Sequence, residues 1–194
     1  MGQRHSLPGE AKAMDPLLAS CSAEGDRNTR VIFLDIDGVL NRTKHATHIR
    51  LDEDLVDELR GLVQRADASL CLSTFWRGFG DYIGYVLSRH GIERGRVVGR
   101  TPGRGHENGF DASDERVYEN RSDEIVAWLS DHPEVLHFVI LDDRDSAGRG
   151  VLQPHFVHVS TRSGLTKRDV EEALRILTFP RPPDLRSREA VVAA

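Results

Sequence analysis

The sequence predicts an α/β domain built on a doubly wound parallel sheet. Two observations lead to this prediction. Short apolar runs, several of them β-branched, alternate with longer segments of helical periodicity, as in chains that build a parallel sheet. The runs are apolar at consecutive positions, which is typical of strands buried on both faces. With 194 residues, of which 39 % are hydrophobic and 29 % charged, the chain is long enough for one domain with a buried core.

The first half of the chain contains three expected strands and two expected helices. A strand is expected at 31–36 (VIFLDI), which ends at an Asp-Gly pair. A helix is expected at 51–66, where apolar residues recur three or four positions apart behind an acidic start. A second strand at 69–73 (SLCLS) precedes a helix at 81–90, which a glycine follows. A third, short strand is expected at 96–98.

The second half of the chain begins with a loop and continues with helices and strands. Four glycines and a proline interrupt any periodicity at 99–120, so this long segment is expected to be a loop. A helix follows at 122–131, with its first residue, a serine, as the N-cap. Strands are expected at 137–141 (HFVIL) and 155–159 (HFVHV). The closing helix at 166–178 begins with a T-x-x-D capping pattern.

The two ends of the chain lack this periodicity. We expect a flexible leader at 1–29, one domain at 30–179 and a flexible tail at 180–194. The leader has no apolar stretch behind a basic start and the chain has no run of about 18 apolar residues, so neither secretion nor a membrane span is indicated. The expected location is therefore the cytoplasm. Cys21 and Cys71 form no C-x-x-C pattern, which disfavours a disulfide framework and a zinc site.

The charge of the chain gives no general indication of nucleic-acid binding, because the net charge is −5. The 26 basic residues nevertheless comprise 23 arginines and three lysines, and the planar guanidinium group fits phosphate. Five arginines against one acid between 89 and 104 form a candidate contact to a phosphate backbone or, alternatively, a solvated surface. Trp76 is a candidate for stacking on a terminal base or for packing in the core.

Acidic and hydroxyl residues follow three of the expected strands, where parallel sheets bind ligands. These residues are Asp35, Asp37, Ser73, Thr74, Asp142, Asp143 and Asp145. Asp35 and Asp37 are two positions apart, so in an extended segment they point to the same side. Several carboxylates at one edge suit Mg²⁺, which prefers oxygen ligands together with a substrate phosphate. One carboxylate can then attack phosphorus while another transfers a proton.

The segment VIFLDIDGV resembles the first motif of the haloacid dehalogenase (HAD) superfamily of phosphotransferases, which have a Rossmann-like α/β fold. The resemblance implies that Asp35 is the nucleophile and Asp37 the general acid and base. It implies that Ser73 binds the substrate phosphate, with Thr74 as the alternative. The implied Mg²⁺ ligands are Asp35, Asp37, Asp142 and Asp143.

The superfamily also uses a lysine or arginine that holds the phosphate. The chain has no lysine between Lys44 and Lys167, so an arginine is expected in this role. Arg121, at the start of an expected helix, is the chosen residue, and Arg100 and Arg116 are the alternatives.

Further motifs resemble the HAD domains of "Swiss army knife" RNA repair proteins. These motifs are STFWR, VVGRTP, RSDEIVAWL, VILDD and GLT, within residues 30–179. The resemblance implies an Mg²⁺-dependent phosphatase whose substrate is a phosphorylated nucleic-acid end. Only 35 residues separate Asp37 from Ser73, and the expected helix uses nearly half of them, so we expect a minimal or absent cap domain and an open site.

Other functions remain as alternatives to end repair. The chain could be a phosphatase of a small metabolite, a nucleotide or a phosphoprotein, or a non-catalytic phosphate-binding module. The H-x-[ST] patterns at His45 and His158 are similar to those of 2H phosphodiesterases. That reading is disfavoured because the residues around His45 have no strand pattern. The preferred end of the nucleic acid and the oligomeric state stay open.

Overall fold

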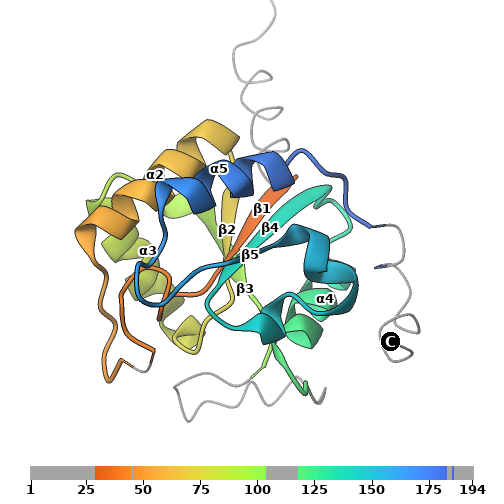
Figure 1. Cartoon of the computed structure of the whole chain (residues 1–194), viewed down its shortest axis with the longest axis horizontal. Helices are drawn as coiled ribbons and strands as arrows, with labels where there is room; N and C mark the ends of the chain where they lie inside the picture. The colour runs from red at the N-terminus through yellow and green to blue at the C-terminus, as the bar shows by residue number, and fades with distance from the viewer. Residues whose placement is uncertain (1–28, 45, 104–117, 183–184, 186–194) are drawn as a thin grey trace, which may run out of the picture.

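A five-stranded, fully parallel sheet forms the centre of the protein, in the computed structural model that describes residues 29–44, 46–103, 118–182 and 185. Its strand order is β3-β2-β1-β4-β5 (Figure 1). The strands are β1 (Arg30–Leu34), β2 (Ser69–Leu72), β3 (Val97–Arg100), β4 (His137–Asp142) and β5 (Phe156–His158). The α-helices are α2 (Glu53–Ala66), α3 (Gly80–Arg89), α4 (Arg121–Asp131) and α5 (Lys167–Ile176). Short 3₁₀ helices are η1 (Arg77–Phe79), η2 (Arg94–Arg96), η3 (Asp145–Ala147) and η4 (Gly150–His155).

Helices cover both faces of the sheet, which explains why the strands are apolar at consecutive positions. In β1, Ile32 and Leu34 belong to the apolar cluster beneath α2, α3 and α5. Val31 and Phe33 belong to a second cluster, beneath α4. Figure 1 shows α2 and α5 side by side on one face and α4 on the other. The predicted doubly wound α/β fold is therefore confirmed.

The strand order reverses direction at β1, since the chain first builds β2 and β3 on one side and later β4 and β5 on the other. Such a switch point leaves a crevice at the carboxyl ends of the two central strands, and ligands of open α/β sheets bind there. Between β1 and β2 the described residues contain a single helix, α2, which packs on the sheet. The expected absence of a separate cap domain in this interval is confirmed for the described residues.

Several element ends differ from the prediction. The helix expected to begin with Ser122 as its cap begins at Arg121, and Asn120 is the N-cap, so the Ser122 prediction was wrong. The Asn120 side chain accepts from the backbone N–H of Asp123, whose carboxylate accepts from the Asn120 N–H. Ser122 lies inside the first turn, and its hydroxyl donates to the carbonyl of Ser146 instead.

Other boundaries shift by one or a few residues. The Thr166–Asp169 capping box is confirmed, although α5 ends before the expected 178. The strand expected at 155–159 is shorter, because His155 belongs to η4 and stacks its ring on Phe138 at 4.2 Å.

The chain after residue 179 contacts the domain wherever the structure describes it. The Arg181 guanidinium donates to the carbonyls of Leu129 and His132 at 2.7 and 2.9 Å. Leu185 is buried in the cluster beneath α4. Packing thus extends past 179 at these two residues. The expected leader up to residue 28 and residues 183–184 and 186–194 of the expected tail lie outside the described residues. No helix among the described residues is both long and apolar enough to cross a membrane.

Candidate active site

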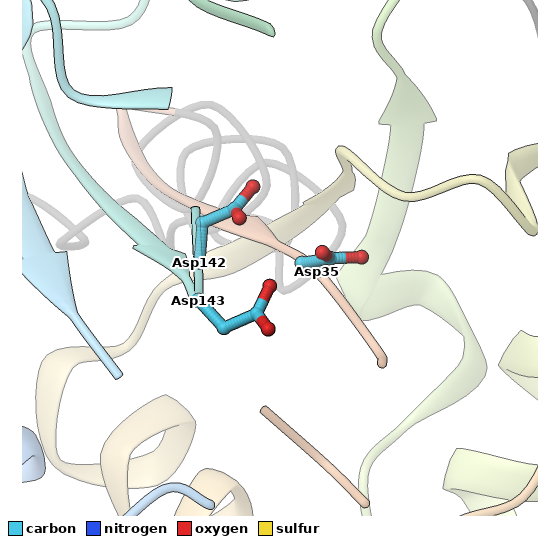
Figure 2. A group of neighbouring side chains, drawn as sticks. All are labelled: Asp35, Asp142 and Asp143. Carbon is cyan, nitrogen blue, oxygen red and sulfur yellow. The ribbon is translucent and has the colours of Figure 1, made fainter. Parts of the chain in front are cut away.

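Three carboxylates meet at the carboxyl ends of the two central strands. Asp35 follows β1, Asp142 is the last residue of β4 and Asp143 comes next. The register pairs Leu34 with Leu141, and the Asp35 N–H donates to the Leu141 carbonyl at 3.0 Å, so Asp35 lies beside Asp142. One oxygen from each of the three carboxylates lies within 4.8 Å of the others (Figure 2). The parallel pairing of β1 and β4 therefore builds the cluster.

Burial and nearby negative charge raise the pKa values of two of these carboxylates, those of Asp35 and Asp142. Burial and, after it, the neighbouring Asp35 carboxylate raise the pKa of Asp142 to about 8, against the attraction of Arg121. Burial also raises the pKa of Asp35, and Arg121 is the largest opposing influence. Arg121 NH1 lies 3.6 Å from Asp35 Oδ1 and 3.3 Å from Asp142 Oδ2. A single guanidinium thus faces two buried acids at the centre of the site.

The chemistry of the cluster fits a hard divalent cation such as Mg²⁺. Asp142 Oδ2 is fully buried and accepts no hydrogen bond from the described residues, although Arg121 lies close. The other oxygens are oriented: Asp142 Oδ1 accepts from the Arg144 N–H, and Asp143 Oδ2 accepts from the Thr161 hydroxyl. The cluster consequently offers three fixed carboxylates that a bound cation would neutralise.

Gly38 allows the backbone to approach the cluster closely. Its φ is +82°, in the left-handed region that glycine adopts without strain. A Cβ at this position would lie 2.5 Å from Asp143 Oδ2. The glycine of the Asp-Gly pair is therefore required both by its backbone conformation and by the space that Asp143 occupies.

Ser73 and Thr74 lie at the end of β2, next to β1, and have different surroundings. The Ser73 N–H donates to the Leu34 carbonyl at 2.9 Å, which holds the residue at the sheet edge. The Ser73 hydroxyl is buried and has no hydrogen-bond partner among the described residues. Thr74 is also buried, but its side chain hydrogen-bonds to Asp35 and so lowers the pKa of that acid. Ser73 is the hydroxyl with unused hydrogen-bonding capacity.

Asp37 lies apart from the three clustered carboxylates. The chain turns after Ile36, because the N–H groups of Val39 and Leu40 donate to the Ile36 carbonyl. Asp37 is the first inner residue of this turn and forms a bridge with Asn41. Asp37 Oδ2 accepts from the Trp76 indole N–H at 3.0 Å and Oδ1 from Asn41 Nδ2 at 2.9 Å. The assignment of Asp37 as a metal ligand stays a prediction.

The burial of Trp76 decides between the two roles predicted for it, stacking on a terminal base and packing in the core. Its side chain is 3 % exposed and belongs to the apolar cluster beneath α2. A ring so enclosed has no open face for a nucleobase, so the stacking hypothesis was wrong and core packing is observed. The role of the indole N–H as a donor to Asp37 was missed, because nothing in the spacing of residues 37 and 76 indicates that they meet.

A buried ion pair connects the segment after β2 with α4, and sequence reasoning also missed it. Arg77 NH1 lies 2.8 Å from Glu124 Oε2, and Arg77 Nε donates to the Thr74 carbonyl at 2.7 Å. The same guanidinium donates to the Thr101 hydroxyl at the end of β3. Glu124 is one turn from Arg121, so Arg77 holds together the two segments that carry the candidate phosphate-binding residues.

The candidate arginines differ in their distance from the cluster. Arg121 is 8 % exposed and contacts two of the acids. Arg100 is exposed and donates to the Arg77 carbonyl, and Arg116 lies outside the described residues. Of the three, the described geometry brings Arg121 to the site.

The structure gives less support to two other predicted sites, the arginine-rich stretch between 89 and 104 and the histidine pair His45 and His158. Arg89 and Arg94 are exposed, whereas Arg96 pairs with Asp67 at 2.6 Å. The His158 ring lies on the surface, 3.1 Å from the Asp143 carbonyl, and its expected partner His45 lies outside the described residues.

The fold and the acidic strand ends are those of a HAD-type α/β domain. Residues 31–170 match the family model described as the HAD domain in Swiss Army Knife RNA repair proteins. The match covers more than half of the 194 residues, and the chain belongs to this family. A search of curated proteins finds no match for the chain.

Proposed function

We propose that the chain is an Mg²⁺-dependent phosphatase that hydrolyses phosphomonoesters through an aspartyl-phosphate on Asp35. The observation that carries the proposal is the set of groups at one sheet edge: three clustered carboxylates, the Arg121 guanidinium and the Ser73 hydroxyl, which has no partner in the described part of the chain. A phosphoryl group in transfer requires a carboxylate that attacks it, positive charge that neutralises its oxygens and a hydroxyl that donates a hydrogen bond to it. The HAD family to which the chain belongs supports the same reaction class.

In the first step, an Asp35 carboxylate oxygen attacks phosphorus. The bond from phosphorus to the ester oxygen breaks, and that oxygen leaves with the electron pair and takes a proton from Asp37. In the second step, a water oxygen attacks the phosphorus of phospho-Asp35 and gives its proton to Asp37. The bond to Asp35 breaks, and inorganic phosphate and the Asp35 carboxylate are released.

The remaining residues bind the phosphoryl group and the cation. Ser73 donates a hydrogen bond to a phosphoryl oxygen, and Arg121 supplies positive charge. Asp35, Asp142 and Asp143 would hold Mg²⁺, which when bound neutralises charge on the phosphoryl oxygens and carboxylates. Asp37 belongs to the proposed ligand set as well, and Mg²⁺ titration of an Asp37→Asn variant tests that assignment.

The proposed substrate is a phosphorylated nucleic-acid end. The name of the matched family, which refers to RNA repair proteins, supports this substrate. Between β1 and β2 the described residues form one helix and no separate domain, an arrangement compatible with a macromolecular end. A phosphatase of a metabolite, nucleotide or phosphoprotein is the alternative. The domain boundaries 30–179 and the cytoplasmic location also remain proposals.

The test is phosphate release from RNA oligonucleotides carrying a 3′- or a 5′-phosphate and, in parallel, from p-nitrophenyl phosphate. Wild type and Asp35→Asn are compared with and without Mg²⁺. Turnover of RNA well above that of the generic ester, lost in Asp35→Asn, supports end repair. Turnover of p-nitrophenyl phosphate alone supports phosphomonoester hydrolysis and rejects an RNA end as the substrate. Absence of turnover on all three substrates rejects the RNA end and leaves a phosphatase with a narrower substrate or a binding module.

A further inference from the structure

We infer that Trp76 is a positioning residue that fixes the carboxylate of Asp37 for proton transfer. The inference rests on the proposed function, in which Asp37 gives a proton to the leaving oxygen. It concerns a residue that touches neither the cluster nor a substrate and acts through Asp37. The observation that carries it is the hydrogen bond from Trp76 Nε1 to Asp37 Oδ2 at 3.0 Å.

The indole can act on Asp37 in only one way. Its N–H is a donor without acceptor capacity, so it binds the acid through an oxygen lone pair. Asn41 Nδ2 donates to the other oxygen, Oδ1, at 2.9 Å and also to the Arg50 carbonyl. The Ala46 backbone N–H also donates to Oδ2, at 3.4 Å. Three donors from different parts of the chain thus fix the carboxylate plane, and Oδ1 keeps a second acceptor direction for the transferred proton.

The Trp76 ring is held in place and does not follow a moving carboxylate. It is 3 % exposed. The ring of Phe75 lies edge-on at 5.9 Å, and that of Phe79 is tilted at 6.2 Å. A rigid donor that is packed in the core gives the orientation that proton transfer needs.

The position of Trp76 in the chain links proton transfer to phosphate binding. Trp76 follows Ser73 and Thr74 on the same segment, and its backbone N–H donates to the Thr74 hydroxyl oxygen at 3.4 Å. Thr74 in turn hydrogen-bonds to Asp35. One short segment after β2 therefore contacts the nucleophile, the proton-transfer group and the proposed phosphate site.

The test uses Trp76→Phe, which keeps an aromatic ring and removes the N–H. Trp128→Phe is the matched control, because Trp128 is also buried but packs on Phe33, in the cluster beneath α4. The kcat/KM of each variant is measured with p-nitrophenyl phosphate, whose leaving group needs little protonation, and with an alkyl phosphate monoester, whose leaving group needs a proton.

A positioning role predicts a selective loss. In Trp76→Phe, kcat/KM for the alkyl ester should fall roughly ten- to hundredfold, while that for p-nitrophenyl phosphate changes less than about threefold. Trp128→Phe should change the ratio of the two values little. In an Asp37→Asn background, Trp76→Phe should cause no further selective loss. Equal losses on both esters, or effects of the two substitutions that simply multiply, would overturn the inference.

A spectroscopic measurement separates failure of this inference from failure of the proposed function. The chain has two tryptophans, so the indole N–H resonance of Trp76 is identified as the one absent from Trp76→Phe. Asp37→Asn should shift that resonance and leave the Trp128 resonance in place. A Trp76 resonance that does not move overturns the inference whatever the activity. A shifted resonance in a protein that hydrolyses neither these esters nor phosphorylated RNA supports the contact and rejects the proposed function instead.

Discussion

Replacing Gly38 with alanine should weaken both folding and cation binding at the carboxylate cluster. The new Cβ would lie 2.5 Å from Asp143 Oδ2 and 2.6 Å from its Cγ, whereas real Cβ atoms essentially never approach closer than 3.0 Å. The Asp143 carboxylate must therefore retreat by about 0.5 Å or more. Distances in a metal site are held to within about 0.2 Å. The displaced carboxylate would consequently be a poorer ligand.

The backbone adds a second cost at this position. Gly38 has a φ of +82°, and left-handed conformations cost a residue with a Cβ about 1–2 kcal/mol. Together with the steric displacement, we expect the free energy of unfolding to fall by about 2–3 kcal/mol. For a protein of this size, that loss lowers Tm by roughly 4–12 °C.

Gly61→Ala is the matched control for this prediction. A Cβ on Gly61, inside α2, has no atom within 4 Å, so alanine there should raise stability by about 0.5–1 kcal/mol. Thermal unfolding of both variants is measured with and without Mg²⁺. We expect Gly38→Ala to show a lower Tm and a smaller Mg²⁺-induced rise than Gly61→Ala. Equal Tm values and equal responses to Mg²⁺ would refute the reasoning.

Three further predictions concern stability. Mg²⁺ should raise the Tm of wild type, because binding at a hundredfold excess over Kd stabilises the folded state by about 2.7 kcal/mol. The rise should be smaller for Asp142→Asn, and equal shifts of the two proteins in a melting assay would contradict Asp142 as a ligand. Arg77→Met leaves the largely buried Glu124 carboxylate with a single, longer ion-pair contact, to Arg121 at 3.9 Å, so denaturant unfolding should show a loss approaching about 3 kcal/mol, and an unchanged midpoint would count against the ion pair. Burial lowers the pKa of His155 below its usual 6.5, so the unfolded chain binds a proton at a higher pH than the folded chain. Stability should therefore fall as the pH drops below about 6.5. Thermal unfolding measured across that pH range should show a less steep fall for His155→Gln.

Local sequence patterns predicted the elements well and their ends less well. The consecutive apolar residues of β1 identified a strand covered on both faces, as Ile32 and Phe33 show by joining opposite clusters. The N-cap of α4 was misplaced by two residues, since both Asn120 and Ser122 are suitable capping residues. The choice between them depends on the Ser146 carbonyl, which attracts the Ser122 hydroxyl from a distant segment.

The candidate site was predicted in its chemistry and only partly in its geometry. The position of Asp35 and Asp142 at strand ends follows from the alternation of strands and helices, and the structure brings these acids together with Asp143. The turn after Ile36, in which the Asn41 side chain reaches Asp37, was not predicted. A hydrogen-bonded turn of a few residues is not visible in a periodicity of two.

The sequence by itself determined which segments become strands and helices and which chemical groups stand at their ends. Both depend on periodicity and on neighbours along the chain. The tertiary structure alone decided which of these groups meet: Asp35 with Asp142 through the pairing of β1 with β4, and Asp37 with Trp76 through packing beneath α2. Such contacts join residues tens of positions apart, and they are selected by the packing of the whole core, which no local pattern records.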